Sequence, residues 1–169
     1  MSLFQDSRYQ WRETYFILID PSRRPTFASL REALLAIGES QLEDPSVDEN
    51  GRFESVTLFA SDGISALELS FVQGEEVVEC RQDLIRDLKS AACETDQEEL
   101  LRRVARYDAR IDVLHFQSVG ESEWTTDELD DEEMDEIVDP GTLLLVLGVI
   151  AQATNGVAID PQSGSILSD

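Results

Sequence analysis

The stretch that most constrains the fold is 53–71, which reads FESVTLFASDGISALELSF. At its centre, Asp62 and Gly63 suit the two-residue turn of a β-hairpin, because both central positions of that turn need a positive φ. A turn at this point brings four apolar side chains onto one face of the two strands, by pairing Leu58 with Leu67 and Val56 with Leu69. Since turn chemistry and apolar alternation agree independently, the sequence predicts an antiparallel hairpin here.

Segments with strand and helix periodicity flank this hairpin. Residues 9–19 alternate between apolar and polar side chains and become apolar on both faces near the end, which is typical of a strand buried on both sides. Apolar residues recur at helical spacing in three further segments. In chain order, the predicted elements are strand 9–19, helix 27–37, an acidic loop at 39–52, the hairpin, helical stretches at 76–93 and 95–107, and strand 110–118.

The C-terminal part adds one helix and a second hairpin. Asp139 and Pro140 suit the N-cap and first turn of a helix that ends near Thr154, and Asn155-Gly156 suits its C-terminal cap. Residues 143–147 are all large and apolar, so every side of this helix carries apolar residues and we expect it to be buried. The sequence after it, GVAIDPQSGSIL, predicts a short terminal hairpin.

This order of elements predicts an α+β fold with an antiparallel sheet. The first six elements have the ferredoxin-like order β-α-β-β-α-β, which places both helices on one face of the sheet. Strands 15–19 and 111–116 are apolar on both faces, so helix 140–154 is expected to cover the other face or to lie in a homodimer interface. We therefore predict a single α+β domain, 1–169, whose parts are a core at 9–118, an acidic loop at 119–138, and a C-terminal helix and hairpin at 139–169.

The charge of the chain narrows the choice of partners. Thirteen basic residues stand against 36 acidic ones, for a net charge of −23. Nucleic acids and anionic membrane surfaces need basic side chains, so both classes of partner are disfavoured. Three explanations of the composition stay open: a GC-rich genome that favours Arg codons, a salty habitat, or a basic protein partner.

Location and chemistry are constrained mainly by what the sequence lacks. It has no signal-peptide pattern at the N-terminus, no apolar run of membrane-spanning length, and only two cysteines, so we expect a cytoplasmic protein. His115 is the sole histidine, which rules out a histidine pair as a catalytic or metal site. Glycine-rich phosphate loops and serine nucleophile elbows are also missing from the sequence. We therefore predict a non-catalytic protein with no cofactor.

The segment 125–141, TTDELDDEEMDEIVDPG, holds nine carboxylates and no basic residue. It lacks the glycine and the ligand spacing of an EF-hand calcium loop, so a dedicated calcium site is not expected. A solvated loop is one interpretation, and weak divalent-metal binding is another. A third is a partner-binding segment, in which sparse apolar side chains and carboxylates contact another protein through Trp124, Asp127, Glu128, Asp130, Asp131 and Met134.

One small cluster of basic residues lies between the first strand and the first helix. Arg23 and Arg24 precede the N-terminus of that helix, where positive charge and free backbone donors can hold an anion. In so acidic a chain, the alternative is that both arginines pair with nearby carboxylates of the protein itself.

Three functional hypotheses follow. The first is a domain acting through protein–protein contacts, for instance an inhibitor or immunity-type protein that neutralises a basic enzyme. The second is an enzyme that uses carboxylates and a divalent metal, which requires acidic residues such as Asp20, Asp62 and Asp160 to converge. The third is a halophilic or marine housekeeping domain whose acidity has no role in binding.

Overall fold

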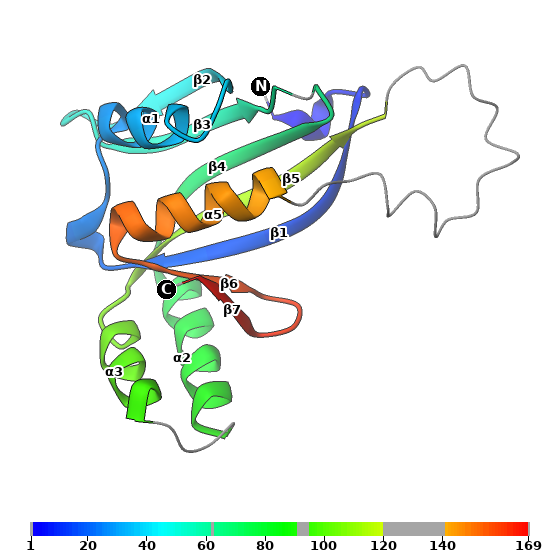
Figure 1. The fold of residues 1–169 in the computed structure, drawn as a ribbon. Coiled ribbons are helices and arrows are strands. Elements are labelled where there is room, and N and C mark those ends of the chain that lie inside the picture. Colours follow the sequence, from blue (N-terminus) through cyan, green and yellow to red (C-terminus); the bar gives the residue numbers. More distant parts are fainter. Residues whose placement is uncertain (1, 62, 91–94, 120–140, 169) are drawn as a thin grey trace, which may run out of the picture.

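The centre of the molecule is a seven-stranded antiparallel sheet with the order β2-β3-β4-β5-β1-β6-β7 (Figure 1). The computed structural model describes residues 2–61, 63–90, 95–119 and 141–168. The strands are β1 (Tyr9–Ile19), β2 (Gln41–Val47), β3 (Phe53–Phe59), β4 (Ser65–Gln73), β5 (Ala109–Ser118), β6 (Val157–Asp160) and β7 (Ser165–Ser168). The described helices are α1 (Phe27–Leu35), α2 (Glu75–Ser90), α3 (Thr95–Val104) and α5 (Gly141–Thr154), with short 3-10 turns η1 (Leu3–Gln5) and η2 (Pro21–Arg23).

The α+β class and both predicted hairpins are confirmed. In the first hairpin, Leu58 lies opposite Leu67 and Val56 opposite Leu69, as the alternation predicts. The predicted two-residue turn is wrong: the Ala60 N–H donates to the carbonyl oxygen of Ser65 at 2.9 Å, so the connection is longer than two residues. Gly63 has a φ of 70° and its N–H donates to the carbonyl oxygen of Ala60 at 3.1 Å, whereas Asp62 lies outside the described residues. The terminal hairpin forms between β6 and β7. A further finding is that, within the described residues, no helix has the length and apolar character needed to cross a membrane.

The turn of the first hairpin allows a direct test of its glycine. Because Gly63 has a positive φ and no atom within 4 Å of an added Cβ, a substitution there meets only backbone strain. We expect Gly63→Val to lower the free energy of unfolding by about 1 kcal/mol, since a β-branched residue resists this conformation. Urea denaturation measures the change. Gly63→Asn is the matched control and should cost clearly less, and an equal cost for both variants would contradict a left-handed turn.

The ferredoxin-like strand order is wrong. In that order a single helix leads from the third core strand to the fourth, and the two strands run parallel with another strand between them. Here two helices connect these strands. α2 leads the chain away from the sheet after β4, and α3 brings it back to the same end of the sheet, where β5 begins. β5 therefore runs antiparallel to β4 and pairs with it directly, from Ser65 opposite Gln117 to Gln73 opposite Ala109.

The predicted acidic loop at 39–52 is also partly wrong, because Gln41–Val47 forms the edge strand β2. Leu42 pairs with Leu58 and anchors this strand. The irregular register after Glu43 accommodates Asp44 at a φ of 50° and a proline at position 45, both of which an edge strand tolerates. These turn-forming residues concealed the strand in the sequence.

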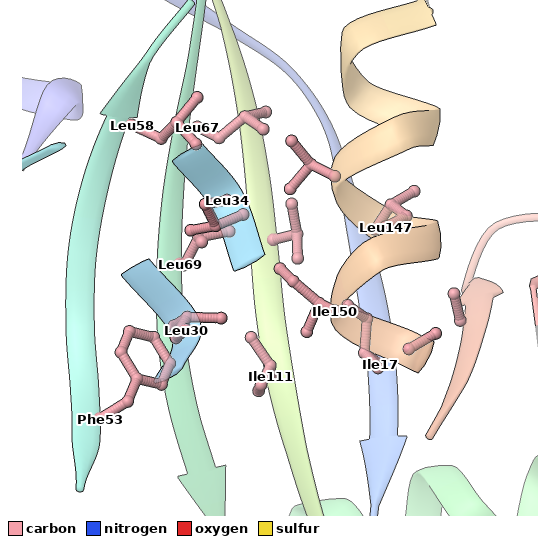
Figure 2. Close-up of a cluster of buried hydrophobic side chains, with 14 of the residues drawn as sticks. Ile17, Leu30, Leu34, Phe53, Leu58, Leu67, Leu69, Ile111, Leu147 and Ile150 are labelled. Atoms are coloured by element: carbon pink, nitrogen blue, oxygen red, sulfur yellow. The ribbon is translucent and has the colours of Figure 1, made fainter. Parts of the chain in front are cut away.

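Two helices, α1 and α5, share one face of the sheet and enclose the main core (Figures 1 and 2). Leu30 and Leu34 of α1 and Leu147 and Ile150 of α5 pack there against inward-facing residues of the strands, including Ile17. The expected cover by helix 140–154 is thus confirmed, but α1 lies beside it rather than on the opposite face with α2.

The predicted burial of α5 on all sides is only partly correct. Leu143, Val146 and Leu147 are buried, but Leu144 and Leu145 remain half exposed on the outer side of the helix. One helix on one sheet face presents its other side outward, and no described element covers that side.

The opposite face of the sheet carries two apolar clusters and a polar area. In one cluster, Leu3 of η1 packs against Ala66 of β4 and Phe116 of β5. In the other, helices α2 and α3 pack on the part formed by β1 and β6, where Leu18, Val157 and Ile159 meet Val77 and Val104. Toward β3 and β4 the same face carries polar side chains that need no helical cover, namely Ser55, Thr57, Glu68 and Ser70. The helical pair therefore lies to one side of the sheet, where it forms a corner with the ends of β1 and α5.

Candidate functional site

An arginine-lined pocket of about 590 Å³ opens at this corner. The turn after β1, the helix α3 with the residues that follow it, and the residue after α5 converge there (Figure 1). Its lining residues are Asp20, Arg23, Glu98, Glu99, Arg102, Arg103, Arg106, Tyr107 and Asn155, a set that we call the arginine pocket.

Helical spacing explains why α3 contributes so many of these side chains. Residues four apart lie above one another on a helix, so Glu98 and Arg102 form one row and Glu99 and Arg103 a second. Arg106, just beyond the helix end, continues the first row. The acidic side chains thus lie toward the N-terminus of α3 and the basic ones toward its C-terminus, where the negative end of the helix dipole favours them.

Tyr107 fixes the inner wall of the pocket. Its ring is buried in the core beneath α3, and its hydroxyl donates a hydrogen bond of 2.6 Å to the carbonyl oxygen of Asn155. Tyr107 follows α3 and Asn155 directly follows α5, so their hydrogen bond joins two connecting segments and forms the floor of the pocket.

Asp20 supplies the wall next to β1. Its carboxylate accepts hydrogen bonds from the backbone N–H of Ser22 at 2.9 Å and from the Ser22 hydroxyl at 2.8 Å. These bonds, together with the charges of Arg106 and Arg23, lower the pKa of Asp20 below its ordinary value. Asp20 is therefore ionised at neutral pH, and both arginines lie within electrostatic range of it.

The four arginines of the pocket form no ion pair with a carboxylate of the described residues, and the same holds for Arg12, Arg31 and Arg52. Arg8, Arg24, Arg81, Arg86 and Arg110 each lie within 4.0 Å of a carboxylate. In the described part of the chain, no carboxylate lies within that distance of the four pocket guanidinium groups, those of Arg23, Arg102, Arg103 and Arg106.

Arg103 is the most constrained of the four. Its Nε atom is buried and has no hydrogen-bond partner among the described residues. A buried donor without a partner costs roughly 1–3 kcal/mol, and more when it belongs to a charged group. The carboxylates of Asp20, Glu98 and Glu99 line the same pocket, so its guanidinium groups outnumber its carboxylates by one. An anion in the pocket would be bound by accessible nitrogens of these groups rather than by the buried Nε.

The two arginines of the predicted anion site, Arg23 and Arg24, lie in different environments. Arg23 lines the pocket, but Arg24 points elsewhere and has an internal role. Its Nε donates to the carbonyl oxygen of Phe53 at 2.9 Å, its Nη1 lies 3.5 Å from Asp48, and its guanidinium stacks 4.1 Å from the centre of the Phe71 ring. Arg24 is therefore held by contacts within the protein.

The predicted partner-binding residues cannot be compared with the pocket. Trp124, Asp127, Glu128, Asp130, Asp131 and Met134 all lie outside the described residues. The same holds for Asp62 of the proposed metal triad. Asp20 caps its own turn, and Asp160 likewise accepts hydrogen bonds from Gln162 and Ser163 nearby in the chain. Within the described ranges, no three or more His, Cys, Asp or Glu side chains are grouped closely enough to hold a metal ion.

His115 lies away from the pocket, within the sheet. It is 3% exposed, and its Nδ1 lies 3.4 Å from a carboxylate oxygen of Glu13 on the neighbouring strand. Its Nε2 has no partner in the described part of the chain. This position agrees with a structural histidine.

Comparison with known proteins adds no assignment: no family model, no curated protein and no solved structure matches the chain significantly. The site therefore has to be interpreted from its own residues. Sequence reasoning identified Arg23 but missed Arg102, Arg103 and Arg106. The available signal was their position four residues after acidic side chains, a pattern that usually indicates salt bridges on a solvated helix.

Proposed function

We propose that this protein is a non-catalytic binding domain whose arginine pocket takes an anionic ligand, either free or carried by a partner protein. The observation that supports this proposal is the concentration of four unpaired arginines around one pocket. The chain has only 13 basic residues against 36 acidic ones, and four of the 13 line this one pocket, where none of them lies within 4.0 Å of a carboxylate of the described residues. Planar guanidinium groups match phosphate and carboxylate oxygens in paired hydrogen bonds.

The proposal retains the idea of a domain that acts through contacts and changes the expected chemistry of the partner. A net charge of −23 suggests a basic protein partner, whereas the pocket favours an anion. The protein can bind a basic partner and an anion on different surfaces, since the acidic segment around 125–138 is separate in sequence from the pocket residues. A cytoplasmic location and a homodimer also stay proposals.

Titration with inorganic phosphate tests the anion pocket. We expect the wild-type protein to bind phosphate and Arg103→Gln to weaken that binding by about tenfold or more, because one lost charge-assisted hydrogen bond is worth roughly 1.5–3 kcal/mol. Isothermal titration calorimetry or amide chemical shifts measure the affinity. Arg86→Gln is the matched control, since Arg86 is an exposed arginine of α2 that pairs with Asp83. Equal affinities in all three proteins would contradict the proposal.

A further inference from the structure

The arginine pocket has a polarity along α3 that restricts its ligand further. Its basic part contains four arginines, Arg23, Arg102, Arg103 and Arg106, which outnumber the one carboxylate beside them, that of Asp20. Its acidic part contains Glu98 and Glu99 at the other end of the helix. One helical turn separates Glu98 from Arg102, which corresponds to about 6 Å. A ligand that uses both parts needs an anionic group at one end and hydrogen-bond donors about one turn away.

The size of the pocket also excludes a lone inorganic anion as the complete ligand. A volume of about 590 Å³ falls in the range of small-molecule sites, roughly 300–1,000 Å³. A single phosphate ion would occupy a small fraction of it and would leave room for further groups beside Glu98 and Glu99. The natural ligand therefore has a body attached to its anionic group.

The rest of the chain opposes long anionic polymers. The four pocket arginines leave only nine other basic residues against 36 acidic ones in the whole chain. A nucleic acid gains affinity from many phosphate contacts along its length, and beyond the pocket it would meet a surface of like charge. A small ligand avoids this repulsion because all of its charge lies inside the pocket.

On these grounds, and resting on the proposed anion-binding function, we infer that the ligand is a small phosphate ester with a hydroxyl-bearing body. Its phosphoryl group is bound by accessible guanidinium nitrogens of Arg23, Arg103 and Arg106. Its hydroxyl groups donate hydrogen bonds to Glu98 and Glu99. This class includes sugar phosphates and mononucleotides, which share the chemistry that the pocket recognises.

The test compares four probes on the full-length protein by calorimetry: inorganic phosphate, ribose 5-phosphate, ribose, and a short single-stranded oligonucleotide. We expect ribose 5-phosphate to bind about tenfold more tightly than phosphate, the oligonucleotide to bind more weakly than ribose 5-phosphate, and ribose alone to show no binding. An oligonucleotide that binds more tightly than ribose 5-phosphate would overturn the inference and favour nucleic acid.

Two variants separate the two ends of the pocket. Arg103→Gln should weaken phosphate and ribose 5-phosphate alike. The double variant Glu98→Gln, Glu99→Gln should weaken ribose 5-phosphate by about fivefold and leave phosphate unchanged or tighter, because removing negative charge helps a bare anion. If the double variant tightens both ligands equally, the glutamates do not contact the ligand body and the inference is wrong.

These outcomes also separate the inference from the function on which it rests. If phosphate binds in an Arg103-dependent way but ribose 5-phosphate binds no more tightly, only the inferred ligand class fails. If neither phosphate nor ribose 5-phosphate binds the wild-type protein, the proposed anion pocket fails with it. Circular dichroism of each variant confirms that it is folded before its affinities are compared.

Discussion

Leu147→Glu should abolish the folded protein. Leu147 is 1% exposed and packs between α5 and the sheet, where the main core of the molecule is formed (Figure 2). The substitution removes a buried apolar side chain and places a carboxylate among apolar side chains of the core. The combined cost exceeds about 5 kcal/mol, which is as large as the whole stability of many domains. We expect insoluble expression, or loss of the cooperative unfolding transition.

Leu145→Glu is the matched control, because it makes the same substitution two residues earlier in the same helix. Leu145 is 55% exposed, so its new carboxylate stays in water, and the free energy of unfolding should change by less than about 1 kcal/mol. Soluble yield and urea denaturation compare the two variants. A stable, soluble Leu147→Glu protein would show that α5 is peripheral and that the architecture described above is incorrect.

Local patterns in the sequence predicted the elements and one register well. Leu58 pairs with Leu67 because a two-strand hairpin with a glycine turn is determined by residues close together in the chain. β1 is confirmed at its predicted bounds, 9–19, for a similar reason. Its apolar alternation is interrupted only at Glu13, next to the register shift between Trp11 and Glu13. These features depend on the alternation of side chains, which any folded strand must satisfy.

The strand order could not be obtained from the same patterns. The strand order depends on whether the segment between β4 and β5 is a crossover connection to a parallel strand or a helical hairpin that leads to an antiparallel neighbour. The sequence shows helical periodicity on both sides of 91–94, but periodicity does not state how two helices lie relative to each other. Counting α2 and α3 as one crossing produced the ferredoxin-like order. Because two helices connect β4 to β5, the chain returns to the same end of the sheet, and β5 pairs with β4 in the antiparallel direction.

The candidate site shows the same limit. Arg23 attracted attention because two adjacent arginines are conspicuous in an acidic chain. Arg102, Arg103 and Arg106 did not, because alternating charge at helical spacing is the usual sign of a solvated helix. Only the meeting of α3 with the ends of β1 and α5 brings these groups together, and this meeting follows from tertiary packing. No local rule predicts it.

The second large effect is expected at Gly156, where α5 ends and the chain turns toward β6. The helix ends in a Schellman motif, in which the backbone N–H of Gly156 donates to the carbonyl oxygen of Ala151 at 2.8 Å. The cap lies at the predicted Asn155-Gly156 pair, and within it the residue with positive φ is Asn155, at 53°. Gly156 is required for a different reason: a Cβ there would lie 2.7 Å from the carbonyl oxygen of Leu18 and 2.8 Å from Cγ2 of Ile19.

We therefore expect Gly156→Ala to lower the free energy of unfolding by about 2–3 kcal/mol, because the backbone of β1 must shift to admit one methyl group. Gly148→Ala is the matched control in the interior of α5. An added Cβ there meets no atom within 4 Å, so alanine should stabilise the helix by roughly 0.5–1 kcal/mol. Urea denaturation of both variants should thus give shifts of opposite sign for the same chemical change. A neutral or stabilising Gly156→Ala would show that α5 does not approach β1 as closely as described, and the floor of the arginine pocket, which depends on Asn155, would lose its support.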